Sequence, residues 1–209
     1  MSDVALVGLS VADPPERWAA VGFHVDDGRV RAHSVLLTLG IAPQGAGIVG
    51  WTLAGLERDG DVAGLRTRRV PGVDGPHHAA PTYLSLTGGI DHVVVVTPRF
   101  DALADELAER GLPLRRVAEI RGTRMGFRRL GGPTLEVVQA PEAATNAFWG
   151  VTFAVPGVPG GAGSLDELCA RSRFLGEPRP AVQPGRRIAA VSREAGLSTR
   201  VAFIDPEPR

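Results

Sequence analysis

The chain has 209 residues, of which 44% are hydrophobic, and its 23 basic and 23 acidic residues leave no net charge. A chain of this size can bury a core as one or two domains, and balanced charge gives no electrostatic reason to expect nucleic acid or a membrane surface as a partner. The single cysteine excludes an intrachain disulfide framework and suits a reducing cytoplasm. No N-terminal signal pattern and no apolar run near the roughly 20 residues of a membrane span is evident, so we expect a cytoplasmic protein without a membrane segment.

One strand pattern occurs three times when the sequence is aligned on proline, at residues 7–14, 91–98 and 149–156. Each copy precedes a helical pattern that ends near a glycine, the residue expected just past a helix. These glycines are Gly22, Gly111 and Gly176. Such repetition predicts three copies of one structural unit.

The first copy is expected over residues 1–57 as a degenerate unit. Asp13 is predicted to cap a short helix that starts at Pro14, and strands are predicted at 30–39 and 48–56. Residues 58–88 are polar and contain several glycines and prolines, so we interpret them as a connection.

The second copy is expected over residues 89–140 and the third over 147–206, so that 89–209 form one domain. In each, the predicted order is strand, helix and three strands. Asp101 is predicted to cap the second helix, and Ser164 is predicted to start the third with a capping box.

The second copy opens on Asp91-His92 in an apolar strand and closes on Leu135-Glu136-Val137-Val138. With its βαβββ order, it resembles the glyoxalase, bleomycin-resistance protein and extradiol dioxygenase superfamily, the vicinal oxygen chelate superfamily. The resemblance covers residues 89–206. It implies an α+β fold in which repeated βαβββ units pair into a curved, cup-like mixed sheet.

By this resemblance, His92 and Glu136 are the candidate ligands of a divalent metal, namely zinc, nickel, manganese or iron. Glu136 is also a candidate catalytic base. The superfamily's usual site has four protein ligands, two from each unit. The corresponding positions of the third copy hold Gly150 and Val201, so half of the set is missing.

Two ligands make a weak metal site unless another residue completes it. His77 and His78, in the predicted connection, are the nearest candidates for a third ligand. The alternative is that His92 and Glu136 hydrogen-bond each other in a polar pocket without metal. A purely structural role for the pair is the third interpretation.

The far wall of the cup is expected to present Gly150, Thr152, Val201 and Phe203 to a ligand. Arg186 and Arg187 follow a Pro-Gly turn; they either clamp an anionic substrate or belong to a solvated hairpin with one arginine in a surface pair. Trp18, Trp51 and Trp149 are interpreted as core residues, and His24 and His33 as structural or surface residues.

The expected function is that of a glyoxalase-like, metal-assisted isomerase, lyase or dioxygenase acting on a small molecule with vicinal oxygens. The alternative is a non-catalytic protein that sequesters a drug or metabolite, as in the bleomycin-resistance branch. A third possibility is a vestigial paired domain with a role in assembly. Because the first copy has no partner in the chain, we expect a homodimer through it; the alternative is that it packs on the back of the cup.

Overall fold

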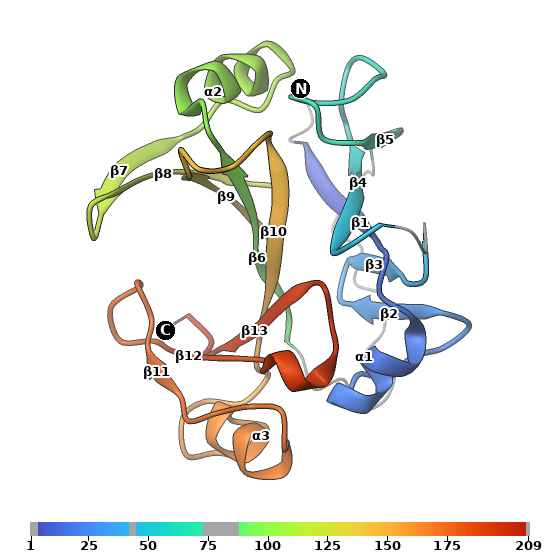
Figure 1. Cartoon of the computed structure of the whole chain (residues 1–209), viewed down its shortest axis with the longest axis vertical. Helices are drawn as coiled ribbons and strands as arrows, with labels where there is room; N and C mark the ends of the chain where they lie inside the picture. The colour runs from blue at the N-terminus through green and yellow to red at the C-terminus, as the bar shows by residue number, and fades with distance from the viewer. Residues whose placement is uncertain (1–3, 42–44, 73–87, 208–209) are drawn as a thin grey trace.

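The computed structural model of the protein describes residues 4–41, 45–72 and 88–207. These residues form an eight-stranded sheet and a five-stranded sheet that lie side by side (Figure 1). Helices and two mixed sheets together confirm the predicted α+β class with a curved sheet. None of the helices in these residues has the length and apolar character needed to cross a membrane.

The eight-stranded sheet is built from two units of one strand, one helix and three strands. The first unit contains β6 (Gly89–Thr97), α2 (Phe100–Glu109), β7 (Arg116–Ile120), β8 (Thr123–Arg129) and β9 (Thr134–Gln139). The second contains β10 (Ala147–Ala154), α3 (Leu165–Arg171), β11 (Arg179–Pro180), β12 (Arg187–Ala190), the 3-10 helix η1 (Arg193–Ala195) and β13 (Arg200–Ile204).

The strand order of this sheet reads the same from both ends. It is β11-β12-β13-β10-β6-β9-β8-β7, with β6 and β10 antiparallel at the centre. Each central strand also pairs in parallel with the last strand of its own unit, β6 with β9 and β10 with β13. The two units are therefore related by an approximate twofold in their strand order, as predicted for the second and third copies.

The predicted helix starts are correct at one helix and wrong at two. At α3, the Ser164 hydroxyl accepts from the Glu167 amide at 3.3 Å and the Glu167 carboxylate accepts from the Gly163 amide. At α1 (Pro15–Val21) the cap is Pro14, and at α2 it is Arg99; neither makes a side-chain cap bond. The carboxylates of Asp13 and Asp101 bind distant donors instead: Asp13 accepts from Ser198 and Thr199, and Asp101 accepts from the Arg124 guanidinium.

The five-stranded sheet corrects the expectation that the first copy has no partner in the chain. It contains β1 (Ala5–Val11), β2 (Arg29–Ala32), β3 (Val35–Thr38), β4 (Ile48–Ala54) and β5 (Thr67–Val70) in the order β2-β3-β1-β4-β5. Strand β1 pairs antiparallel with β4, and each pairs in parallel with a later strand, β1 with β3 and β4 with β5. The four central strands of the large sheet, β13-β10-β6-β9, pair in the same way. Strands β1 and β4 thus correspond to the two antiparallel central strands β6 and β10, although fewer strands flank them.

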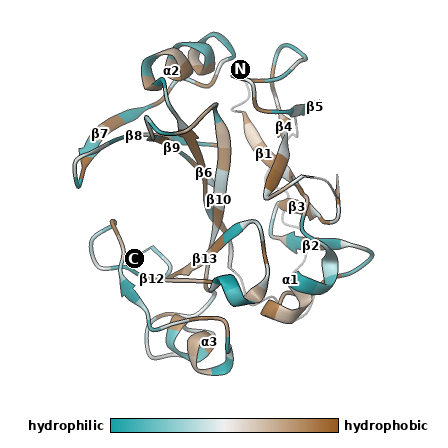
Figure 2. Ribbon diagram, in the orientation of Figure 1, coloured by the Kyte–Doolittle hydropathy of each residue, from teal (hydrophilic) through white to brown (hydrophobic). Residues whose placement is uncertain are grey.

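The small sheet packs on the back of the large one, and Figure 1 shows it on the side away from the hollow between β7 and β11. Trp18 and Phe23 contact Phe153, and Phe23 also stacks on Phe203 at 5.6 Å between ring centroids. The central strands β1, β6 and β9 carry much of the hydrophobic colouring in Figure 2. The first copy thus buries its apolar face within one chain, and the physical argument for a homodimer no longer holds.

Candidate functional site

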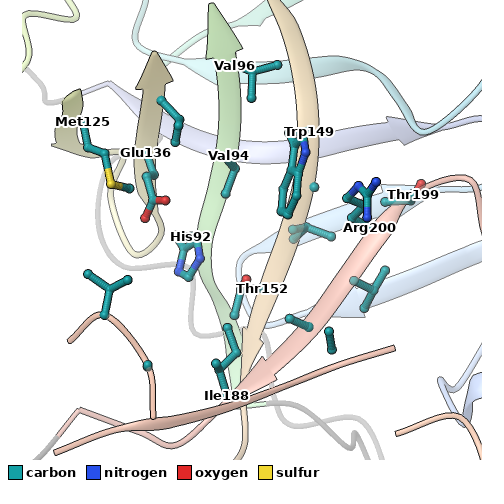
Figure 3. Close-up of a pocket in the computed structure, with 18 of the residues that line it drawn as sticks. His92, Val94, Val96, Met125, Glu136, Trp149, Thr152, Ile188, Thr199 and Arg200 are labelled. Carbon is teal, nitrogen blue, oxygen red and sulfur yellow. The ribbon is translucent and has the colours of Figure 1, made fainter. Parts of the chain in front are cut away.

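A cavity of about 880 Å³ lies in the hollow of the large sheet. Its walls include the solvent-side faces of β6, β9, β10 and β13, and Figure 3 shows side chains from all four strands pointing into it. The polar and aromatic side chains that matter below are His92, Glu136, Trp149, Thr152 and Arg200. Its volume is typical of sites that enclose a drug-sized molecule.

Strand β6 contains a β-bulge next to His92. His92 lies opposite Thr152 of β10, but the next pair is Ile90 with Phe153, so Asp91 is an extra residue on β6. A bulge interrupts the strict alternation of side chains. Ile90 and Val93 therefore both face the core, while His92 lines the cavity and Asp91 lies beside the His92 ring.

Asp91 joins His92 to a buried arginine. Its carboxylate accepts from the His92 ring at 2.8 Å (Nδ1 to Oδ2) and also from the Arg186 guanidinium. Burial alone raises the pKa of Asp91, but the hydrogen bonds and charges of His92 and Arg186 outweigh it and hold that pKa below its usual range. Because an ionised carboxylate only accepts, Nδ1 carries the proton and Nε2 is the ring nitrogen left for a ligand.

Arg186 does not line the cavity; it contacts the site only through Asp91. Its Nε donates to the Asp205 carbonyl at 2.7 Å and its side chain is almost fully buried. The interpretation of the Pro-Gly turn as a solvated hairpin is wrong for Arg186. Arg187 does make a surface pair, with Asp166, but it also binds the buried Asp205 at 2.9 Å. The Arg186 Nε and one terminal nitrogen donate within the protein, and its role in binding a ligand stays a prediction.

Glu136 lies on the strand next to His92 and points into the same part of the cavity (Figure 3). Burial raises the pKa of Glu136; the nearby Asp91 charge raises it further and His92 opposes the change. Within the described part of the chain, His92 bonds to Asp91 and not to Glu136. The prediction that the two share one face of the sheet is thus confirmed, while their roles as metal ligands or base stay predictions.

The described residues do not fit the four-ligand metal centre implied by the resemblance. No group of three or more His, Cys, Asp or Glu side chains among residues 4–41, 45–72 and 88–207 is placed to hold a metal. Gly150 has no donor, and a Cβ there would lie 2.5 Å from the carbonyl oxygen of Arg200. Val201 is buried in the core. His77 and His78 lie outside the described residues.

The far wall of the cavity differs from the prediction at Phe203 on β13. Gly150, Thr152 and Val201 line the cavity as expected, and Gly150 and Thr152 pair with Arg200 and Ala202. Phe203 is fully buried among the aromatic rings on the other face, so the prediction that it contacts a ligand needs correction. The strands pair in register, and therefore the even-numbered residues of β13 share the face of Gly150 and Thr152.

Trp149 was predicted to be a core residue, but it is 51% exposed and lines the cavity. It too is a bulge residue: Phe148 lies opposite Val95 and Gly150 opposite Val94, which leaves Trp149 as the extra one. Phe148 packs on Trp51 at 5.3 Å, so the neighbouring indole lies on the cavity side. The signal in the sequence is the spacing of Phe148, Val151 and Phe153, which departs from the alternation of an even strand.

The loop between η1 and β13 completes the wall, and the small sheet holds it. Asp13, only 2% exposed, accepts from the Ser198 amide at 2.6 Å, the Ser198 hydroxyl at 2.6 Å and the Thr199 amide at 2.8 Å. Burial alone raises the pKa of Asp13, but these bonds outweigh it and keep the pKa low. Ser198 and Thr199 line the cavity, so the loop connects the two sheets at the site.

Comparison with solved structures supports the fold. A mutant of 4-hydroxymandelate synthase from Streptomyces coelicolor matches with a TM-score of 0.60 and 13% identity over 100% of this chain and 94% of that one. Methylmalonyl-CoA epimerase from Mycobacterium tuberculosis matches with a TM-score of 0.49 and 16% identity over 63% of this chain and 95% of that one. No family model matches the sequence, and no curated protein matches it significantly.

The paired βαβββ units and the match along the whole chain define a fold of the vicinal oxygen chelate type. At 13% identity the likeness concerns the fold alone. The described chain contains two sheets built on this pattern. The first sheet is reduced to five strands, and the second, eight-stranded sheet carries the cavity.

Proposed function

We propose that the protein binds a small molecule with vicinal oxygens in its cavity and catalyses a proton transfer, as a glyoxalase-like isomerase or lyase. The observation that supports this is the placement of Glu136, with its raised pKa, beside a histidine that Asp91 holds in one orientation. Groups poised in this way are typical of acid-base catalysis.

In the proposed step, the Glu136 carboxylate takes a proton from a carbon next to a substrate carbonyl. The electron pair of the broken C–H bond moves into the carbonyl and forms an enolate. His92 Nε2 accepts from a substrate hydroxyl, or donates to the enolate oxygen when the ring is protonated. When His92 moves the substrate hydroxyl proton to the enolate oxygen, return of the first proton to the former carbonyl carbon gives the isomeric carbonyl compound. Departure of a leaving group from the carbon next to the enolate, with the electron pair of the enolate forming the new double bond, gives a lyase product.

This proposal uses protein groups alone, because the described donor set is two residues, His92 and Glu136, and does not make up a four-ligand centre. The metal-assisted versions of the expectation require further ligands from residues outside the described part of the chain. Metal analysis of protein purified without chelator tests them separately. A near-stoichiometric divalent metal that His92→Ala removes would establish a ligand role for His92.

The test is deuterium incorporation from D2O into 2-hydroxy and 2-oxo carbonyl compounds, followed by NMR. Wild-type protein should speed exchange of the carbon-bound hydrogen next to the carbonyl. Glu136→Gln should slow that exchange by about 100-fold or more. Glu106→Gln on the exposed side of α2 is the matched control and should leave the rate unchanged. Equal exchange rates for Glu136→Gln and wild type would refute the proposal.

A second candidate is binding and sequestration without chemistry. The observation that favours it is a cavity with largely apolar walls and an exposed tryptophan. The same experiment separates the two functions: a compound that raises the unfolding temperature but shows no catalysed exchange is sequestered and not converted.

A cytoplasmic location and a homodimer remain predictions. Light scattering on the purified protein decides the assembly: a mass near that of one chain at micromolar concentration would exclude the homodimer under those conditions.

A further inference from the structure

Trp149 and Arg200 form a pair at the wall of the cavity formed by β10 and β13. The Arg200 guanidinium lies 5.0 Å from the centre of the Trp149 ring. Figure 3 shows the two side chains next to each other on the same wall. An arginine stacked on an indole keeps its N–H edge available for an anion.

The backbone is built to bring these two side chains together. The bulge at Trp149 places its side chain on the cavity side. Gly150 lies in register with Arg200, and a Cβ on Gly150 would lie 3.0 Å from the Arg200 Cβ and closer still to its carbonyl oxygen. Only glycine lets β13 approach β10 this closely, so the stem of Arg200 lies beside the indole.

Arg200 makes no ion pair with the described residues, and its known contact is the indole. The residues that line the cavity include three arginines, Arg121, Arg193 and Arg200, against two glutamates, Glu136 and Glu142. An exposed tryptophan face next to an available guanidinium is suited to a flat ring that carries a negative charge.

We propose that Trp149 and Arg200 form a subsite for a ring-bearing carboxylate, with the ring against the indole and the carboxylate on the guanidinium. This inference rests on the proposed function, because it assigns a ligand class to the same cavity. His92 and Glu136 then act on another part of the same molecule, and the volume of about 880 Å³ accommodates such an extended ligand.

The test uses phenylacetate, its neutral analogue phenylacetamide, and acetate, with tryptophan fluorescence as the readout. Trp18 and Trp51 are 0% and 1% exposed, so a quenching ligand reports on Trp149. Phenylacetate should bind at least about tenfold more tightly than phenylacetamide or acetate, since only it offers both a ring and a charge.

Arg200→Gln should remove the preference for phenylacetate over phenylacetamide. Trp149→Leu, followed by calorimetry, should weaken both compounds by about tenfold. Arg173→Gln is the matched control, because Arg173 also stacks on a ring, Phe174, but lies outside the cavity; it should change neither affinity. Thermal unfolding of each variant checks that it is folded.

Equal affinities for phenylacetate and phenylacetamide in the wild type, or an unchanged preference in Arg200→Gln, would overturn the subsite, as would the absence of binding by all three compounds. Glu136→Gln separates this inference from the proposed function. If that variant keeps normal proton exchange while Arg200→Gln loses the preference, the proton-transfer proposal fails and the subsite stands. If Glu136→Gln slows proton exchange while Arg200→Gln keeps the preference for phenylacetate, the subsite is rejected and the proton-transfer proposal stands.

Discussion

Asp13→Asn tests whether the small sheet holds the cavity wall in place. The Asp13 carboxylate accepts three hydrogen bonds from Ser198 and Thr199, which lie more than 180 positions away in the chain. The substitution removes the charge and replaces one carboxylate oxygen with an amide nitrogen. That nitrogen donates, so it cannot accept from the Ser198 and Thr199 donors. It changes the side-chain volume little, so packing is largely preserved.

The expected cost follows from these bonds. Hydrogen bonds to a charged group contribute about 1.5–3 kcal/mol each, and the asparagine oxygen can still serve some of the donors. We therefore expect a loss of roughly 2–4 kcal/mol in the free energy of unfolding, a large fraction of the 5–15 kcal/mol typical of a domain. At about 2–4 °C per kcal/mol for a protein of this size, the unfolding temperature should fall by roughly 5–15 °C.

The assay is urea unfolding at neutral pH, with phenylacetate binding measured in the same samples. Asp105→Asn is the control, because Asp105 is exposed on α2, and its effect should stay within about 0.5 kcal/mol. Asp13→Asn should also weaken phenylacetate binding. Asp13 fixes Ser198 and Thr199, the two residues that precede Arg200 in the chain, so the substitution should loosen the position of Arg200. Equal stability of the two variants would refute the reasoning.

The difference between wild type and Asp13→Asn should also depend on pH. Because the pKa of Asp13 is lowered in the folded protein from its ordinary 3.8, its contribution is present above that value. The contribution is lost as pH falls through the folded pKa. The two unfolding curves should therefore converge in acid, and a difference that stays constant down to strong acid would contradict the assignment.

Three further outcomes are expected. Arg186→Met should cost about 3–5 kcal/mol in urea unfolding because it leaves Asp91 buried without its cation; a loss below 1 kcal/mol would show that His92 alone satisfies Asp91. Gly150→Ala should cost about 1–3 kcal/mol by overpacking against Arg200, and unchanged stability would mean that β13 moves freely. Glu136→Gln should raise the unfolding temperature at neutral pH, since the raised pKa of Glu136 means that its charged form is disfavoured in the fold. That gain should disappear below the unfolded pKa near 4.5, and proton exchange by the wild type should increase with pH as Glu136 ionises.

The paired units of the large sheet could be predicted from the sequence because their signals are local. Strand, helix and turn patterns repeat with matched prolines, and alternation predicts which residues share a face with His92 on its strand and with Glu136 on the other. The Ser164 capping box is also a short-range pattern, and the structure contains it. Each of these features depends on residues within one element.

The small sheet could be predicted only in part. The strand at 48–56 was expected, but the single strand predicted at 30–39 is wrong, since two antiparallel strands, β2 and β3, occupy those residues. Strand β5 is four residues long, with two arginines, and lies in the predicted connection. Such a strand has no hydrophobic period of its own, and it exists because its partner β4 pairs with it. The duplication within residues 4–72 therefore emerges from the order of strands in space.

The sequence by itself determined the repeated units, the residues that share a face with His92 and with Glu136 along their own strands, and the missing ligands at Gly150 and Val201. Only the tertiary structure decided that Asp91 and Trp149 are bulge residues and that Asp13 holds the loop at Ser198. The physical reason is that the side-chain period of a strand is encoded in its own residues. A bulge or a buried carboxylate depends on the register and donors of a segment far away in the chain.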